Sequence, residues 1–594
     1  MKILVLASLE IRRAVFVSML LLIGSMSTVV RANTLIWDPI GATSGLMDGA
    51  GTWTATTGTN WNNGTAGNPW SNSTGDMAQF GNASSTSGYT VTVSGSINVG
   101  GIIFDEPNAD GKGYTVQGTS ATVTGTLNGP SGGTFYISAP NAPFFTQNAI
   151  NNINFTGAST YQFDSSTTVL GGGWGMASDS FSGNVVVGNG TDSGEVYWYP
   201  TDTITSGTLI VNSGTFGGGW SMYAANQSGT YNMPMQLNSM GTRGGGGLWT
   251  TGENLTWNGA IALGADASIT YGSGPGYLYV FNGAISGNHN LWVGDSGADA
   301  AGQTSEMFLT NTNNNYTGAT LIGNIGGSDA VGGVAEEPLG IGANNALPVS
   351  TIVIMGIYYL DQPYPGISSY RTLTNGQTTN NPNSDSALDL HGFNQSVTGL
   401  AVAQGATAAS QLIGNWVNGA TSILTITGTT SNGSYQGGFG GTITDGFGMG
   451  TGKVELVLSG TGAGGAGTLA ALNLTGANSY SGGTVVNSGV LTGATQSFGI
   501  GSLTINPTGT TGTAAYDAAT VTSTGAIFFN AAVTVNSNPG IEPTDIGTLN
   551  LGGTAASIGS LAGNGNVVLS ATNGTTASIG FNPFGLNSPK LASA

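Results

Sequence analysis

The sequence contains no cysteine, and only 6% of its 594 residues are charged. The missing cysteine excludes a small scaffold that depends on disulfides, and it excludes a thiol nucleophile. The scarcity of charge excludes a charged coiled coil and argues against a solvated disordered chain. Stability must therefore come from extended backbone pairing around a continuous apolar core.

Basic side chains are especially scarce, with 9 Lys and Arg against 28 Asp and Glu. Without residues 1–32, the remaining chain has 5 basic and 27 acidic residues, a net charge of about −22. Such a surface repels phosphate backbones, so we do not expect nucleic acid to be a partner.

Glycine is abundant, at 103 residues, but it lacks the three-residue period of collagen. Glycine provides the positive φ that tight turns need, and the β-branched residues between the glycines suit a pleated, half-buried surface. The composition therefore predicts an all-β chain of many short strands. A repeat solenoid can absorb the whole length as one body.

Residues 1–32 have the features of a cleaved signal peptide. Basic residues precede an apolar run at 14–30, and small residues at 30 and 32 fit a cleavage site. A membrane anchor is the alternative, but the Ser and Thr residues inside the run favour cleavage. No later segment approaches about 18 unbroken apolar residues, so we expect no transmembrane segment after cleavage. The mature chain should begin near Asn33 and be exported, to the outer cell surface or beyond.

Three segments repeat one order of residue types: an aromatic, a hydroxyl residue, a glycine, a small residue and a three-residue strand. They are Tyr480–Val486, Tyr316–Ile322 and Phe181–Val187. We interpret each aromatic as a corner of one turn, or rung, of a coil. In the first segment Thr484 and Val486 should face one side and Val485 the other. Gly482 and Gly489 are interpreted as turn glycines.

The segment Asn478–Leu491 (NSYSGGTVVNSGVL) closely resembles the core motif of the autotransporter-associated β-strand repeat. This repeat is found in very large exported proteins of Gram-negative bacteria. Weaker resemblance extends to NNALPVSTIVIMG from Asn344, SALDLHGFNQSVTGLA from Ser386 and ASIGSLAGNGNVVLS from Ala556. The resemblance implies a right-handed parallel β-helix, the passenger architecture of type V secretion, with rungs of ~20–25 residues.

An autotransporter of this kind should close with a translocator barrel of alternating strands. The chain ends in NSPKLASA, without such strands. The resemblance therefore leaves open whether a barrel is encoded elsewhere or whether the chain belongs to secreted relatives that lack one.

We predict three parts: a signal peptide (1–32), an N-terminal β-rich cap (33–118) and a parallel β-helix (119–594). The cap is expected because the open end of a β-helix exposes unpaired backbone. Its first part is crowded with tryptophans, at Trp37, Trp53, Trp61 and Trp70. A surface row of tryptophans would stack on sugar rings, but we favour packing over the first open rung.

The sequence offers few candidate groups for chemistry. Its two histidines, His289 and His391, have no second ligand nearby in sequence, and we interpret both as turn or rung residues. No nucleophile elbow with a histidine partner and no phosphate-binding loop is present. We therefore predict no catalytic, cofactor-binding or metal-binding residue, and no cofactor.

Polysaccharide chemistry is the alternative, because it needs paired carboxylates or aspartate-bound calcium beside a base. The basic residues are isolated, at Lys112, Arg243, Arg371, Lys453 and Lys590. Carboxylates occur in close sets, namely Asp105 with Glu106, Asp192 with Glu195, Asp295 with Asp299, Glu336 with Glu337, and Asp385 with Asp389. We favour solvated loop carboxylates that keep the protein soluble, while catalysis or calcium binding at one set stays open.

Two functions follow. The first is a non-enzymatic, exported structural or adhesive protein whose polar surface makes many weak contacts with glycans or other cell surfaces. The second is a secreted polysaccharide lyase or hydrolase built on a β-helix. The sequence does not indicate the oligomeric state or the binding partner.

Overall fold

A computed structural model describes residues 33–593 with gaps, and the predicted signal peptide at 1–32 lies outside the described residues. The longest internal gaps in the description are 296–304, 326–337, 360–385, 429–437, 461–469, 508–517 and 580–589.

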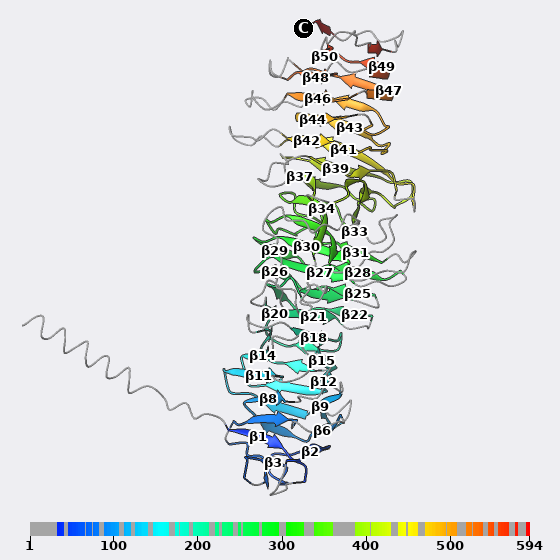
Figure 1. The fold of residues 1–594 in the computed structure, drawn as a ribbon. Helices are drawn as coiled ribbons and strands as arrows, with labels where there is room; N and C mark the ends of the chain where they lie inside the picture. The colour runs from blue at the N-terminus through cyan, green and yellow to red at the C-terminus, as the bar shows by residue number, and fades with distance from the viewer. Residues whose placement is uncertain are drawn as a thin grey trace, which may run out of the picture.

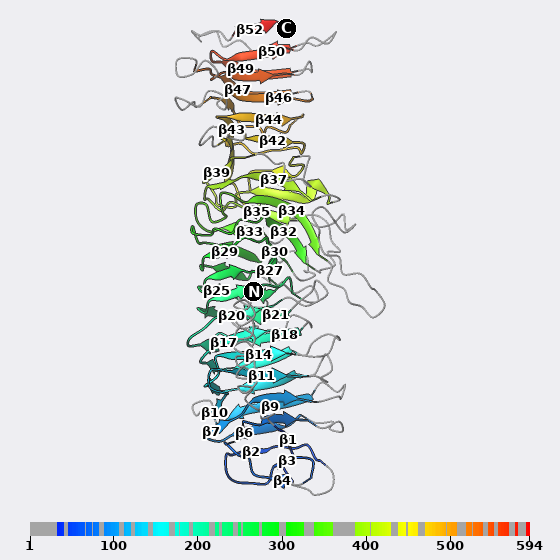
Figure 2. The same cartoon turned by 90° about the vertical axis from the view of Figure 1, so that its left-hand side faces the viewer.

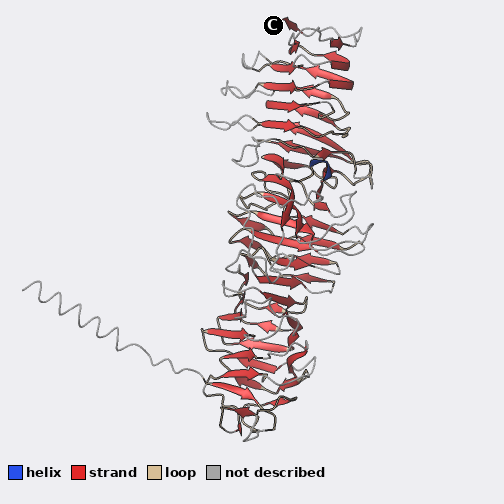
Figure 3. Ribbon diagram, in the orientation of Figure 1, coloured by secondary structure: helices blue, strands red, loops and turns tan. Residues whose placement is uncertain are grey.

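The described residues form a parallel β-solenoid, a column of short stacked strands that is much longer than it is wide (Figures 1 and 2). This confirms the predicted all-β, parallel β-helix fold. The only helical segment among the described residues is the 3-10 turn η1 (Ala408–Ser410), visible as the single blue segment in Figure 3. Within the described part of the chain, no helix is both long and apolar enough to span a bilayer.

Two long sheets form two faces of the column in its amino-terminal part. Most neighbours in each sheet lie three strands apart in chain order, so a typical rung gives one strand to each of three faces. The first sheet has twelve strands: β29 (Ile285–Gly287), β26 (Ile261–Leu263), β23 (Met235–Leu237), β20 (Leu209–Val211), β17 (Asn184–Val187), β14 (Thr160–Asp164), β11 (Thr134–Ser138), β8 (Gly101–Phe104), β5 (Met77–Phe80), β1 (Thr34–Trp37), β3 (Trp61–Asn62) and β4 (Gly67–Asn68). The second has thirteen strands: β2 (Gly51–Trp53), β6 (Thr90–Val93), β9 (Lys112–Gly118), β12 (Gln147–Asn151), β15 (Gly173–Ala177), β18 (Gly194–Trp198), β21 (Trp220–Ala224), β24 (Leu248–Thr250), β27 (Ala267–Tyr271), β30 (Leu291–Asp295), β32 (Thr320–Ile325), β34 (Ile352–Tyr359) and β37 (Gly399–Val402).

The third face is divided between two sheets. The shorter sheet has five strands: β19 (Thr203–Ile204), β16 (Ser180–Phe181), β13 (Ile153–Thr156), β10 (Gly125–Asn128) and β7 (Ser96–Asn98). The next has eight strands: β22 (Gly229–Tyr231), β25 (Leu255–Trp257), β28 (Leu278–Phe281), β31 (Glu306–Leu309), β33 (Pro338–Ile341), β35 (Ser386–Asp389), β38 (Gln411–Gly414) and β40 (Thr442–Ile443).

The carboxyl-terminal part is built from two sheets whose neighbours, apart from β36 and β39, are two strands apart in chain order, so each rung there contributes two named strands. The larger sheet has eight strands: β36 (Gln395–Val397), β39 (Thr421–Ile426), β41 (Lys453–Leu458), β43 (Gly483–Val486), β45 (Leu503–Ile505), β47 (Ile527–Val535), β49 (Ala556–Ala562) and β51 (Ala577–Ile579). The smaller has six strands: β42 (Ala471–Leu474), β44 (Gly489–Gly493), β46 (Ala519–Ser523), β48 (Gly547–Asn550), β50 (Asn566–Leu569) and β52 (Lys590–Ser593).

One apolar core runs along the inside of the column. Alternate residues of the strands are buried, as in β43, where Thr484 and Val486 are buried and Val485 is less so. The residues of this core form one contiguous cluster from Leu35 to Val567. Because fully burying one large apolar side chain is worth about 1.5–3 kcal/mol, the repeated inward positions supply the stability that no disulfide provides.

The repeated aromatics are buried; Tyr316 and Tyr480 lie between named strands, as predicted for corners, whereas Phe181 ends β16. Tyr480, Tyr316 and Phe181 are fully buried. The Tyr480 hydroxyl lies 2.6 Å from Thr484 Oγ1, and the Thr484 hydroxyl donates to the Phe498 carbonyl at 2.9 Å. Since the threonine has a single proton, the tyrosine must donate to it. This pairing explains why tyrosine and threonine are four residues apart in the motif.

An Asn or Asp two residues before each corner aromatic binds the preceding rung. Asn478 Oδ1 accepts a hydrogen bond from the Ile443 N–H at 2.7 Å, and Asn314 Oδ1 accepts one from Ile285 at 2.6 Å. Asp179 occupies the same position and accepts from the Ile153 N–H. These side chains satisfy backbone donors that would otherwise be buried without a partner.

The motif glycines have two different roles. Gly489 has a φ of 92°, as expected for a turn glycine. Gly482 differs from the prediction, because the positive φ of 109° belongs to its neighbour Gly483. At Gly482 a side chain would instead collide with the Val454 carbonyl of the preceding rung. Close stacking of rungs, rather than turn geometry, requires glycine there.

The amino-terminal end is closed by four buried tryptophans, here called the tryptophan plug: Trp37, Trp53, Trp61 and Trp70. The Trp61 ring centroid lies 4.9 Å from that of Trp53 and 4.7 Å from that of Trp70. The pairings of β3 with β1 and β4 are the antiparallel ones among the named strands. Buried rings cannot stack on sugars, so these residues pack the end of the core. The long sheets continue across residue 118, the predicted cap boundary.

Candidate functional site

Most of the carboxylates singled out in the sequence lie outside the described residues: Glu106, Asp192, Asp299, Glu336, Glu337 and Asp385. The side chains of Glu195 and Asp295 are also outside the description, as are Arg243, Arg371 and the side chains of Lys112 and Lys590. The described members of these sets are Asp105, Asp389 and the exposed Lys453.

Asp105 and His289 have simple surroundings. Asp105 Oδ2 accepts a hydrogen bond from the Gln79 amide at 2.9 Å. His289 Nδ1 lies 3.6 Å from Asp266 Oδ1, in a pair whose side chains are 34% and 55% exposed. Both match the interpretation as surface and turn residues.

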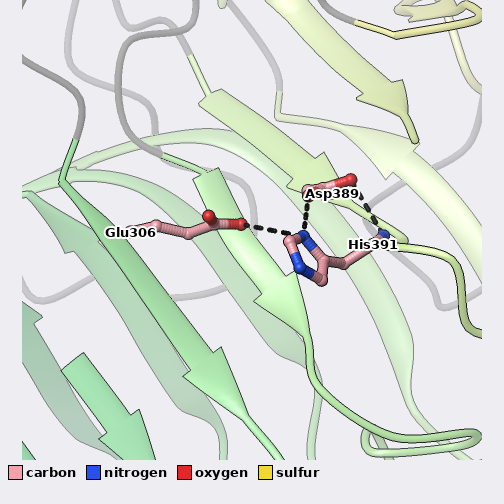
Figure 4. A group of neighbouring side chains, drawn as sticks. All are labelled: Glu306, Asp389 and His391. Atoms are coloured by element: carbon pink, nitrogen blue, oxygen red, sulfur yellow. Dashed lines mark hydrogen bonds and ion pairs between the residues drawn. The ribbon is translucent and has the colours of Figure 1, made fainter. Parts of the chain in front are cut away.

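His391 has different surroundings from His289, because the fold places it beside two carboxylates. One potential ligand atom from each of Glu306, Asp389 and His391 lies within 4.8 Å of the others (Figure 4). Glu306 opens β31 and Asp389 ends β35, with β33 hydrogen-bonded between them. This Glu306–Asp389–His391 cluster is the candidate functional site.

Asp389 is the fixed member of the cluster. It is fully buried, and its Oδ1 accepts hydrogen bonds from the backbone N–H groups of His391 and Trp416, each at 2.9 Å. Its Oδ2 lies 2.8 Å from His391 Nδ1. One oxygen is therefore occupied by the backbone, and the other faces the imidazole.

His391 is positioned by an unusual backbone conformation. Its φ is 45°, in the left-handed region, and the following Gly392 has a φ of 82°. A non-glycine residue in this region is strained, and the Asp389 hydrogen bond to the His391 N–H holds the turn. The Phe308 ring meets the imidazole edge-on, with centroids 4.7 Å apart. The turn thereby directs the ring toward the carboxylates.

Glu306 is the least satisfied member. The residue is only 9% exposed, and its Oε1 is buried without a hydrogen-bond partner. That oxygen lies 3.9 Å from His391 Nδ1. Burial, followed by the negative charge of Asp389 and a hydrogen bond with it, raises the pKa of Glu306 to about 9. The glutamate therefore keeps its proton at neutral pH.

Two carboxyl groups and one imidazole can hold a proton between them or bind a metal ion through oxygen and nitrogen. From the sequence we group Asp389 with Asp385 and predict no second ligand for His391. The missed local signal is the spacing of Asp389 and His391, two residues apart at the end of a strand. Glu306 carries no such signal, because only the stacking of β31, β33 and β35 brings it to the site.

No protein-family model, curated protein or solved structure matches the chain. The stacked parallel strands show a parallel β-helix repeat protein.

Proposed function

We propose that the chain is a non-enzymatic, exported structural or adhesive protein whose solenoid is a passenger-like shaft at the cell surface or in the extracellular matrix. The observation that carries this proposal is the uninterrupted stacking of strands around one core, from Leu35 to Val567. Each rung contacts mainly its neighbours, so added rungs give length and a repeated surface. Such an elongated solenoid is suited to extend from the cell surface and to make many contacts at once.

The outer surface supports an adhesive role. Asn232, Asn258 and Asn282 lie on successive rungs and are exposed, and their side-chain amides are linked by hydrogen bonds of 2.9 Å. A row of equivalent amides presents the same donors and acceptors at regular intervals. Many weak contacts of this kind add up to useful avidity for glycans or another cell surface.

The resemblance of Asn478–Leu491 to autotransporter-associated repeats supports the same proposal. The conspicuous residues of that segment, Asn478 and Tyr480, make contacts between and within rungs, as expected for a shaft. Export by a type V route and a Gram-negative host are part of the proposal.

The test compares cells that make the full chain with cells that carry an in-frame deletion of its gene. We expect protease added to intact cells to digest the protein, and we expect the deletion to reduce attachment or cell aggregation. The purified exported protein should release no new reducing ends from pectin or alginate. Turnover that a single carboxylate substitution abolishes would instead establish a polysaccharide-degrading enzyme.

A further inference from the structure

The Glu306–Asp389–His391 cluster lies across β33, whose Gly340 separates the strand of Glu306 from the strand of Asp389. Phe308, Gly340 and Asp389 are aligned in register across β31, β33 and β35. A Cβ added at Gly340 would lie 2.7 Å from Glu306 Oε1 and 2.5 Å from the Phe308 ring. Any side chain on the middle strand at this position would therefore collide with Glu306 and Phe308.

The cluster includes one buried oxygen that the described protein groups leave unsatisfied. Glu306 Oε1 is buried without a hydrogen-bond partner, and Asp389 Oδ2 has the His391 ring nitrogen as its hydrogen-bonding neighbour. A buried polar atom without a partner costs roughly 1–3 kcal/mol, so its retention needs an explanation. A ligand that accepts electron pairs from Glu306, Asp389 and His391 together would provide one.

We propose that Glu306, Asp389 and His391 bind one divalent cation of the zinc class. The site is independent of the proposed function of the shaft. Tetrahedral Zn²⁺ with bonds of about 2.0–2.1 Å places its ligand atoms about 3.3 Å apart. The two separations from His391 Nδ1, 2.8 Å to Asp389 and 3.9 Å to Glu306, lie on either side of this value.

The donor set favours zinc over calcium. Ca²⁺ takes six to eight oxygen ligands, whereas this cluster supplies two carboxyl groups and an imidazole nitrogen. His391 Nδ1 and Asp389 Oδ2 lie 2.8 Å apart, so the cation would take the place of the hydrogen bond between them. The His391 side chain is 36% exposed, which leaves one side of the site open to water as a further ligand.

Binding would join strands that are not direct neighbours. Glu306 on β31 and Asp389 on β35 are separated by β33, a span of roughly 10 Å between the outer strands. A cation held by both would connect three rungs on the outside of the column. Because it binds only the folded arrangement, it should stabilise these rungs by mass action.

The test uses the full exported chain, purified without a polyhistidine tag and stripped of metal. Titration with zinc chloride, followed by calorimetry, should show one site per chain. His391→Asn removes the imidazole but tolerates the positive φ, and Glu306→Gln keeps the size of the side chain. Each substitution should weaken Zn²⁺ binding by at least about tenfold.

His289→Asn is the matched control, because His289 also lies beside an aspartate but has no second carboxylate described near it. It should leave Zn²⁺ binding unchanged. Cobalt(II) loaded into the wild type should absorb in the visible as a tetrahedral complex, and His391→Asn should lose this spectrum. Gly340→Ala keeps all three ligands but pushes Glu306 and the Phe308 ring aside, so it should also weaken binding.

The proposal is overturned if the wild type shows no stoichiometric zinc binding, or if His391→Asn and Glu306→Gln bind as tightly as His289→Asn. Circular dichroism of each variant shows that it is folded. If one of the two ligand variants does not fold, the other decides the result.

Discussion

At the scale of single residues, the hydroxyl of Tyr480 shows how the repeat motif is fixed. Its partner Thr484 already donates to the Phe498 carbonyl, so the tyrosine proton satisfies the remaining acceptor of a buried hydroxyl. Tyr316 and Thr320 make the same 2.6 Å contact in another rung. Tyr480 is thus a core residue whose hydroxyl donates one hydrogen bond.

Tyr480→Phe should remove only that hydrogen bond and cost about 1 kcal/mol, whereas Tyr480→Ala should cost about 3–5 kcal/mol because it also leaves a cavity. The damage should stay local, since each rung contacts its neighbours. Hydrogen exchange should therefore show lost protection in β42 to β45 and little change in β1 to β9. Tyr136→Ala, at a side chain that is 47% exposed, is the control. Unchanged protection together with lost binding to a glycan would make Tyr480 a contact residue instead.

Asp179 is a second single residue with a clear consequence. Where other rungs have Asn314 or Asn478, this rung has a carboxylate whose Oδ2 is buried without a hydrogen-bond partner. Burial, then the nearby charge of Asp202, raises the pKa of Asp179 well above its usual value. The folded protein therefore retains a proton that the unfolded chain releases near pH 4.

Asp179→Asn should stabilise the protein at neutral pH. Because the folded-state pKa of Asp179 is raised, the stability that this side chain contributes is fully present below the unfolded-state pKa of about 3.9. That stability is lost as the pH rises toward the folded-state pKa. The amide keeps the acceptor for Ile153 without this loss. Urea midpoints of both proteins at about pH 7.5 and pH 4 should show a gain that shrinks in acid. A gain that is larger in acid would contradict the argument.

At the scale of the strand and the rung, register is set by the length of each turn. Asn258 stacks on Asn232, and these two residues are 26 positions apart. In the same rung Met235 pairs with Ile261, and Leu248 with Ile269. Removal of one complete turn should therefore place each remaining strand on an equivalent partner.

Deletion of residues 235–260 tests this expectation. Ile261 would then pack in the place of Met235, and Asn282 would stack on Asn232. The corner glycine Gly283 would meet the Met233 carbonyl, as Gly259 does in the intact chain. We expect a folded, monomeric protein with a thermal midpoint close to that of the parent, measured by circular dichroism.

Deletion of only 235–247, about half a turn, is the matched control. It places Leu248, from another face, where Met235 belongs, so it should unfold the rungs around it. If both deletions are equally stable, turn length does not set the register.

At the scale of the whole molecule, the ends of the column matter most. Inner strands have partners on both sides, whereas a strand at an open end exposes unpaired backbone and invites another chain. The tryptophan plug and the antiparallel pairing of β3 with β1 protect the amino-terminal end. This closure is consistent with a shaft that remains separate rather than joining end to end.

Removal of residues 33–80 deletes β1 to β5 and should expose Phe104 and the edge of β8, which pairs with β5 in the intact protein. We expect larger species by light scattering and size-exclusion chromatography. The 235–260 deletion shortens the chain as well but leaves the plug in place, so it should stay monomeric. A folded monomer without residues 33–80 would show that the plug does not prevent association.

Some of this arrangement could be predicted from local order in the sequence. The glycine-rich, charge-poor composition predicts strands and tight turns, and the segment after Tyr480 predicts a strand, a turn at Gly489 and a second strand. Inward and outward positions follow from the alternation along a strand. The burial of the four tryptophans is also predicted, because the open end of an apolar core needs to be covered.

The role of Gly482 and the cluster at His391 depend on contacts between rungs. Gly482 is required by the carbonyl of Val454, and Glu306 reaches Asp389 only across β33. Intervening loops vary in length, so no fixed period in the sequence tells which residues become neighbours. The sequence determined the fold class and the internal order of a rung, because these follow from short-range backbone preferences. Only the tertiary structure decided which side chains meet on adjacent rungs, because stacking joins residues that are distant along the chain.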